Sequence, residues 1–165
     1  IFGPRQTLTT SNVNSLYKNA MHIRRNSRIC IYNSIFVGWT GGLLIDGSAC
    51  ENNATNGDLQ IRNCLLSGCS SFFSQVSGST FSTKDWFQTA AFSNDTLKEN
   101  SSVKITDPWA ATPNFLPITG SPALSNADFT NPKLTGFDAV TFRGAFGATD
   151  WTSGWTNWNP QTTEY

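Results

Sequence analysis

The sequence predicts an all-β fold, a right-handed parallel β-helix (solenoid) with a lateral insertion and an aromatic-rich C-terminal cap. The first observation is an internal repeat, because residues 29–39 (ICIYNSIFVGW) align with residues 59–69 (LQIRNCLLSGC). Three aligned positions are identical: Ile31 and Ile61, Asn33 and Asn63, Gly38 and Gly68. A fixed period of about 30 residues is typical of solenoids. The second observation is that each copy alternates apolar and polar residues and breaks at asparagine, which indicates two short strands joined by a bend.

Composition narrows the class of protein. Charged and aromatic residues each make up 13% of the chain, and 11 basic residues balance 11 acidic ones. A chain without net positive charge lacks the electrostatic attraction to phosphates that nucleic-acid-binding proteins use, so we expect no nucleic acid partner. No apolar run approaches the roughly 20 residues that cross a bilayer, so we expect no transmembrane segment.

The N-terminal part leads into the repeat. Residues 1–20 are polar and aperiodic, and we expect them to continue from missing upstream coils, because a solenoid that began here would leave its stack uncovered. On this interpretation the chain is a C-terminal fragment, and the alternative is a complete domain capped by residues 1–20. Residues 21–78 form the β-helix coils. A spacing of about 4.8 Å between coils would set Asn33 against Asn63, so that their amides form a ladder.

The second half has a different character. Residues 79–112 are predicted to be a lateral insertion that opens with a short helix, capped by Asp85 and carrying Trp86 and Phe87. Residues 113–165 are interrupted by proline and glycine, and we expect closing strands followed by a C-terminal cap.

Two segments carry a resemblance to a known family. Residues 114–124 (NFLPITGSPAL) and 143–147 (RGAFG) resemble the segments that close bacterial β-helix proteins of the pectate-lyase-like superfamily. Nearly the whole chain is similar to the C-terminal portion of uncharacterised cell-surface β-helix proteins of the Bacteroidetes type. The resemblance implies a secreted or bacterial cell-surface location, such as the outer membrane, and it assigns no catalytic residue. Asp95-Thr96-Leu97 further resembles the motif that such bacteria O-glycosylate, which makes Thr96 a candidate site in a glycoprotein.

The cysteines suit an exported chain. The disulfide candidates are Cys30, Cys50, Cys64 and Cys69. Three pairings are possible for two disulfides, and a bridge from Cys50 to Cys64 is favoured, the alternative being that some are small buried residues. Their spacing does not match a zinc site, so we expect no metal and no cofactor. Asp46 and Asp58 are the candidates for structural calcium, but no Asp-x-Asp motif supports such a site.

Two clusters are candidates for ligand binding. Trp151, Trp155 and Trp158 place three indoles within eight residues, and exposed indole faces stack on sugar rings. The alternative is that they cover the end of the solenoid. Arg24 and Arg25 form the second cluster, although consecutive residues of a strand point to opposite faces, and a solvated strand edge is the alternative.

These observations lead to a functional hypothesis. The carboxylates are scattered without an obvious pair, so no catalytic residue is predicted. We expect a non-catalytic extracellular module, structural or glycan-binding and adhesive. Its expected partner is the upstream part of the same protein or another chain, and a polysaccharide is a further candidate. The alternative is the C-terminal part of a carbohydrate-active enzyme, a polysaccharide lyase or glycosidase, with its site on upstream coils.

Overall fold

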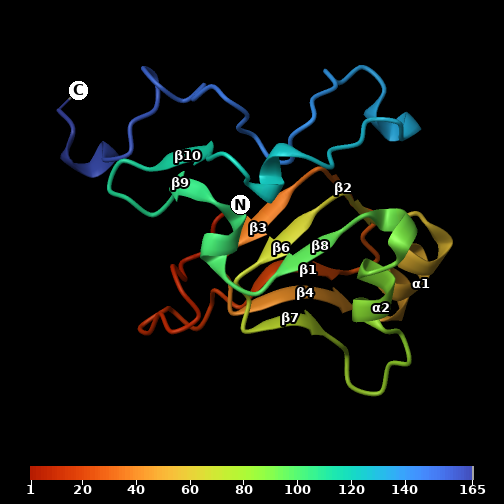
Figure 1. Ribbon diagram of the computed structural model, residues 1–165. Coiled ribbons are helices and arrows are strands. Elements are labelled where there is room, and N and C mark those ends of the chain that lie inside the picture. Colours follow the sequence, from red (N-terminus) through yellow and green to blue (C-terminus); the bar gives the residue numbers. More distant parts are fainter. Residues whose placement is uncertain (165) are drawn as a thin grey trace.

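The computed structural model describes residues 1–164, and its strands form four small sheets (Figure 1). Three sheets are parallel, and a pair of strands later in the chain is antiparallel. The first sheet contains β1 (Asn19–Arg24), β4 (Gly41–Asp46) and β7 (Ser71–Ser74). The others contain β2 (Cys30–Tyr32) with β5 (Gln60–Arg62); β3 (Ile35–Val37) with β6 (Leu65–Ser67) and β8 (Asp95–Leu97); and β9 (Ile105–Asp107) with β10 (Asn114–Pro117).

The two copies of the internal repeat lie side by side. In β2 and β5, Ile31 pairs with Ile61, and in β3 and β6, Ile35 pairs with Leu65. Both pairings are parallel, because each copy enters its strands in the same direction. The repeat in the sequence is therefore a pair of adjacent parallel strands on each of two sheets.

The predicted β-helix is nevertheless wrong. The strands are three to six residues long and belong to separate sheets of two or three strands, and no closed or continuous solenoid sheet is present among residues 1–164. The repeat occurs in only two copies, so it supplies too few strands to extend a sheet. After β8 the chain changes to 3-10 turns and to the antiparallel pair β9–β10, which a parallel solenoid does not contain. The predicted boundaries at residues 20, 78 and 112 stay a prediction.

The predicted asparagine ladder is also not formed. Asn33 and Asn63 both adopt the left-handed backbone conformation, with φ of 49° and 54°, which asparagine tolerates better than most residues. Their side-chain amides donate instead to the main chain of a distant segment, at the carbonyls of Asp128 (3.0 Å) and Asn126 (3.1 Å). The bend at each asparagine directs the amide away from the neighbouring copy and towards the C-terminal half.

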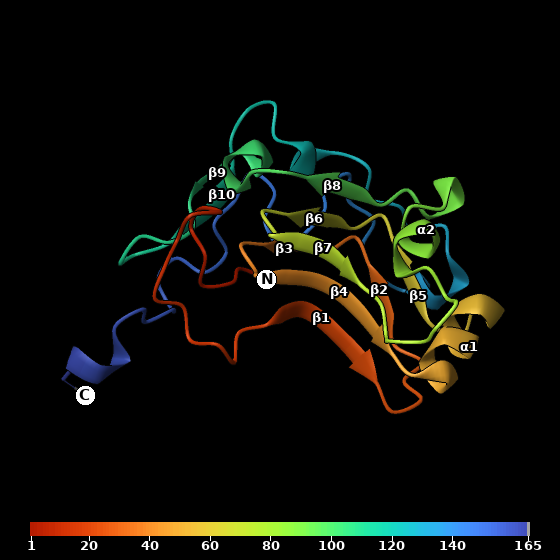
Figure 2. The ribbon, with the colours of Figure 1, turned by 90° about the horizontal axis from the view of Figure 1, so that it is seen from below.

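Two helices flank one end of the strands. Helix α1 (Ser48–Asn56) ends at Gly57, whose left-handed backbone (φ 79°) terminates it. Helix α2 (Thr83–Phe87) is capped by the hydroxyl of Ser82, which accepts a hydrogen bond from the backbone N–H of Asp85. The predicted cap, Asp85, is therefore inside the helix. Both helices lie opposite the end of the molecule that carries the C-terminus (Figures 1 and 2).

The main core lies between the parallel sheets and these helices. Its fully buried side chains include Leu43, Ile61, Leu66 and Phe87. A smaller cluster between β3, β6 and the segment that follows β8 contains Ile35, Leu65, Val103 and Ala123. Burial of this apolar area is what stabilises the short strands, which would be marginal alone.

The remaining residues contain turns and short helices. These are η1 (Ala90–Phe92), η2 (Asn100–Val103), η3 (Pro122–Leu124), η4 (Pro132–Leu134) and η5 (Pro160–Thr162). Arg143 attaches this C-terminal part to the sheets: its buried guanidinium donates to Asp95 Oδ2 on β8 (2.8 Å) and to the Pro122 carbonyl (2.9 Å). Within the described part of the chain, no helix has the length and apolar character required to span a membrane.

Candidate functional site

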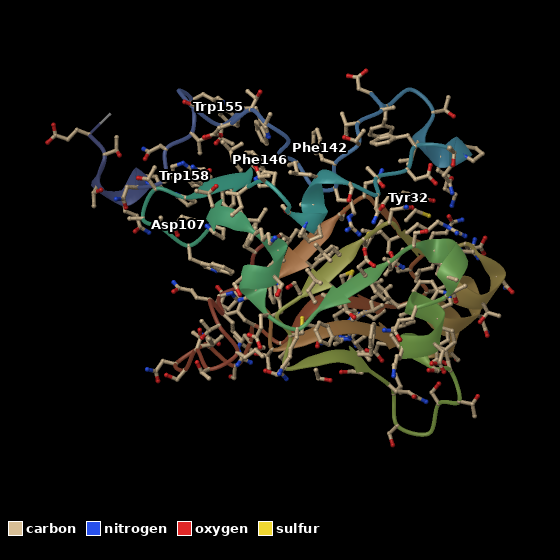
Figure 3. All side chains as sticks on the ribbon, viewed as in Figure 1. Tyr32, Asp107, Phe142, Phe146, Trp155 and Trp158 are labelled. Carbon is tan, nitrogen blue, oxygen red and sulfur yellow. The ribbon has the colours of Figure 1, made fainter. Side chains whose placement is uncertain are left out.

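A connected series of aromatic rings runs from an apolar cavity to the protein surface, and we refer to it as the aromatic ladder. Its members are Trp109, Phe2, Phe115, Phe146, Trp151 and Trp155, with Trp158 as a branch on Phe115. Successive ring centroids lie 5.3–5.7 Å apart. Figure 3 shows Phe146, Trp155 and Trp158 on the side of the molecule away from the parallel sheets. Such spacings are those of favourable aromatic pairs.

The outer end of the ladder is stacked. Phe146 and Trp151 lie 5.4 Å apart with an interplanar angle of 20°, and Trp151 and Trp155 lie 5.7 Å apart at 27°. Trp151 is 50% exposed and Trp155 is 68% exposed. The chain therefore presents nearly parallel indole rings to solvent.

Backbone hydrogen bonds fix the orientation of these indoles. Trp151 Nε1 donates to the Ala145 carbonyl (2.8 Å), and Trp155 Nε1 donates to the Trp151 carbonyl (2.6 Å). The turn that carries them is closed by Asp150, whose side chain accepts from the backbone N–H of Thr152 (3.0 Å). Because both indole N–H groups are already bonded, the rings offer their faces, rather than their polar edges, to a ligand.

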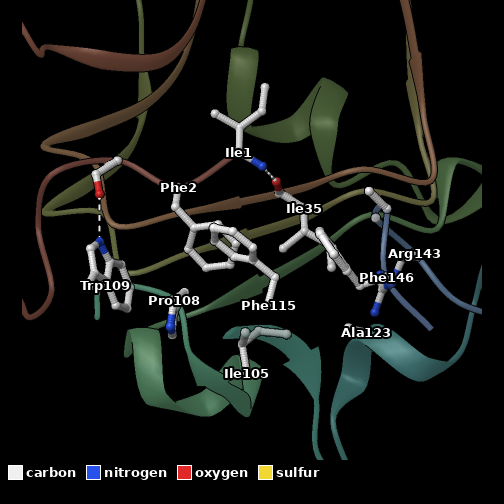
Figure 4. A pocket seen from close by; sticks show the side chains of 13 residues that line it. Ile1, Phe2, Ile35, Ile105, Pro108, Trp109, Phe115, Ala123, Arg143 and Phe146 are labelled. Atoms are coloured by element: carbon white, nitrogen blue, oxygen red, sulfur yellow. Dashed lines mark hydrogen bonds between the residues drawn. The ribbon is translucent and has the colours of Figure 1, made fainter. Parts of the chain in front are cut away.

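The inner end of the ladder lines a cavity of about 450 Å³ (Figure 4). Four ladder rings contribute to its wall: Phe2, Trp109, Phe115 and Phe146. The remaining wall of the cavity is largely aliphatic and includes Ile35, Ile105, Pro108 and Ala123. Trp109 is held by a hydrogen bond from its Nε1 to the Gly3 carbonyl (2.9 Å). A cavity of this size and lining is typical of sites for small apolar groups.

Among residues 1–164, Arg143 is the one charged side chain at this cavity. It is 1% exposed, and its Nε has no hydrogen-bond acceptor among the described residues, although the two terminal nitrogens are bonded. A buried donor without an acceptor is unusual and costly in proteins.

The basic pair predicted from the sequence lies elsewhere. Arg24 ends β1, and its Nε is 3.6 Å from Asp46 Oδ2, which also contacts His22 Nε2 at 2.9 Å. Arg25 follows β1 in a left-handed turn with φ of 58°. The structure thus engages Arg24 in an ion pair on the first sheet and does not bring either arginine to the tryptophans.

All four cysteines are free thiols in the structure. Cys64 Sγ contacts the Arg62 carbonyl (3.2 Å) rather than another sulfur. Burial raises the pKa of Cys64 to about 12 and the pKa of Cys69 to about 11. Cys30 is partly exposed, and Lys133 Nζ donates to its Sγ at 3.0 Å.

The two remaining candidates lie outside the ladder. Thr96 is in the middle of β8, partly buried, at the wall of a second, more polar cavity of about 420 Å³. Asp46 and Asp58, considered for calcium, form ion pairs with Arg24 and Arg28. Among residues 1–164 no group of three or more His, Cys, Asp or Glu side chains gathers in a way that could hold a metal ion.

Sequence reasoning missed the inner half of the ladder. The tryptophans were found because three occur within eight residues, and Phe146 lies in the RGAFG segment. Nothing in the sequence placed Phe2 beside Phe115, since only the folded chain brings them to 5.3 Å.

Comparison of the chain with family models, with curated proteins and with solved structures found no match.

Proposed function

We propose that this chain is a non-catalytic module that binds glycans through the outer end of the aromatic ladder. The observation that carries the proposal is the stacked, exposed pair Trp151 and Trp155, held by backbone hydrogen bonds. A rigid aromatic face loses little conformational entropy when it binds, so more of the contact energy appears as affinity. The C–H faces of a sugar ring are an apolar surface that such a face can cover.

The surroundings of the tryptophans are suited to a hydroxylated ligand. Ser153 and Asn157 are exposed and lie two residues from Trp155 on either side in the sequence. The Ser153 hydroxyl can donate to or accept from sugar hydroxyls, whereas the Asn157 amide already donates to Thr163 Oγ1 (2.9 Å) and accepts from the Asn159 N–H (2.8 Å). With 11 basic and 11 acidic residues, the chain has no net charge to attract a polyanion, so we propose a neutral glycan.

We further propose an extracellular setting, secreted or on a bacterial cell surface. The support is the resemblance of residues 114–124 and 143–147 to segments of exported proteins. In that setting the module would attach its protein to a polysaccharide, as an adhesive or structural part.

The test is glycan binding by the full chain and by two variants. Neutral polysaccharides and oligosaccharides are screened by affinity electrophoresis, and positive ligands are measured by isothermal titration calorimetry. Trp155→Ala is expected to weaken binding about fivefold, which corresponds to the roughly 1 kcal/mol of one aromatic contact. Phe137→Ala is the matched control, because Phe137 is 65% exposed but does not belong to the ladder.

Three outcomes would contradict the proposal. Binding that Trp155→Ala and Trp151→Ala leave unchanged would place the site elsewhere. Absence of binding to every neutral glycan would leave the ladder with a structural role. Release of new reducing ends from a bound glycan would show turnover and favour the carbohydrate-active enzyme.

A further inference from the structure

We infer that the ladder and its cavity bind one ligand together, a glycan that carries an aryl substituent, with the sugar on the outer tryptophans and the aromatic group in the cavity. This inference rests on the proposed function, because it assigns the sugar to the same indole faces. It adds a second contact and a class of ligand.

The lining of the cavity excludes a bare sugar. Apart from Arg143, the side chains of the wall are aromatic or aliphatic. A sugar ring placed there would leave several hydroxyls without partners, and each unsatisfied buried polar group costs roughly 1–3 kcal/mol. An apolar group has no such cost, so the cavity discriminates between the two parts of a substituted glycan.

The lining also favours an aromatic group over an alkyl chain. The Phe2 ring lies 5.5 Å from Trp109 and 5.3 Å from Phe115, and a ligand ring can extend this arrangement. A cavity of about 150 Å³ is enough to hold benzene, so a volume of about 450 Å³ accommodates an aryl group and its link to the sugar.

Two rings connect the cavity to the outer surface. Phe146 lines the cavity and stacks on Trp151 at 5.4 Å, and Phe115 lines the cavity and contacts Trp158 at 5.7 Å. A sugar on Trp151 is therefore separated from the cavity by a single ring. Because the two sites are this close, we infer one ligand that contacts both of them, rather than two independent ligands.

The experiment compares matched ligands by calorimetry with the full chain. For the sugar identified above, or for glucose, galactose and mannose in parallel, the probes are the free sugar, its phenyl glycoside, its octyl glycoside below the micelle concentration, and phenol. The phenyl glycoside is expected to bind at least tenfold more tightly than the free sugar, and more tightly than the octyl glycoside and phenol.

A pair of alanine variants tests the cavity itself. Ala145→Leu fills the cavity at an exposed lining position, and Ala148→Leu is an equally exposed control outside the lining. Ala145→Leu keeps the backbone carbonyl to which Trp151 Nε1 donates, and it is expected to remove the advantage of the phenyl glycoside over the free sugar; Ala148→Leu is expected to leave that advantage unchanged. Circular dichroism verifies that both variants are folded.

The failures of the two proposals are distinguishable. Equal affinity for the phenyl glycoside and the free sugar, with both still sensitive to Trp155→Ala, would overturn the inference and keep the glycan-binding function. Phenol that binds as tightly as its glycoside, or an octyl glycoside that binds more tightly than the phenyl one, would overturn the assignment of a bridging aryl glycan. No binding of any sugar or glycoside would overturn both.

Discussion

Residues 19–97 and residues 113–164 are stabilised in different ways. The first region pairs short parallel strands around a core in which Leu43, Ile61 and Phe87 have no exposed surface. The second region has one antiparallel strand, turns and 3-10 helices, and it leaves Trp151 and Trp155 half or more exposed. Burial holds the first region together, whereas ring contacts and a few anchoring hydrogen bonds hold the second. Apolar surface that the fold does not bury is available for a ligand.

The largest difference between the two regions should appear in stability. Phe87→Ala removes a fully buried ring from the main core, and we expect it to lower the free energy of unfolding by about 3–5 kcal/mol. Trp155→Ala removes a ring that is mostly exposed, so its effect should stay within about 0.5 kcal/mol. Urea denaturation followed by circular dichroism measures both. Similar losses for the two variants would show that the ladder is part of the folding core.

The next effect concerns the ion pair that joins the regions. Arg143 is buried, whereas the side chain of Asp95 is 49% exposed. Asp95→Ala leaves a buried guanidinium without its carboxylate, and we expect a loss of about 2–3 kcal/mol. Arg143→Met leaves only a carboxylate that water can reach, so we expect the smaller loss. Denaturation of both single variants and of the double variant measures the coupling, and the opposite order would mean that packing by the Arg143 side chain outweighs its charge.

A smaller effect concerns the attachment of residues 126–128. Asn33 both donates to the Asp128 carbonyl and accepts from the Asp128 N–H at 2.9 Å. Asn33→Gly preserves the left-handed backbone and removes these bonds, for an expected loss of about 1 kcal/mol. Asn33→Ala should cost about 1 kcal/mol more, because alanine is strained at a φ of 49°. Faster hydrogen exchange at Asp128 in both variants would locate the loss; unchanged exchange there would contradict the assignment.

The last effect appears only at alkaline pH and concerns the thiols. Burial raises the pKa of Cys64 and Cys69 above the ordinary value of 9.0, so in the folded protein they stay protonated where the unfolded chain ionises. This contribution to stability is complete below about pH 9 and is lost as the pH rises from about 9 to about 12. At pH 8 a thiol reagent should label the partly exposed Cys30 first, and Cys64 and Cys69 only after unfolding. Labelling of all four at one rate would show that the core opens freely.

The same comparison explains what the sequence could predict. The repeat correctly indicated short strands in both copies, because alternation and matched bends are local patterns and Ile31 indeed pairs with Ile61. The extension of that pairing into a continuous solenoid was wrong, because two copies do not determine how many strands follow. Asn33 and Asn63 were recognised as bends, but their partners at residues 126 and 128 depend on where a distant segment packs.

In the candidate site, too, local sequence patterns were predictable and long-range contacts were not. Trp151, Trp155 and Trp158 were visible because they are close in sequence, but the stacking of Phe146 on Trp151 and the cavity behind it are properties of the fold. Arg143 was noticed only as the first residue of the RGAFG segment, and nothing in the sequence marked it as a buried ion-pair partner. Its importance comes from complete burial, which only packing produces.

The stacked indoles also make the protein its own optical reporter. Two indole rings 5.7 Å apart at a fixed angle of 27° couple their electronic transitions, so Trp151 and Trp155 should give an exciton couplet in the circular dichroism spectrum. The signal should vanish in either single tryptophan variant. Because a ligand on the outer ring alters that coupling, binding could be followed without any label attached to the chain.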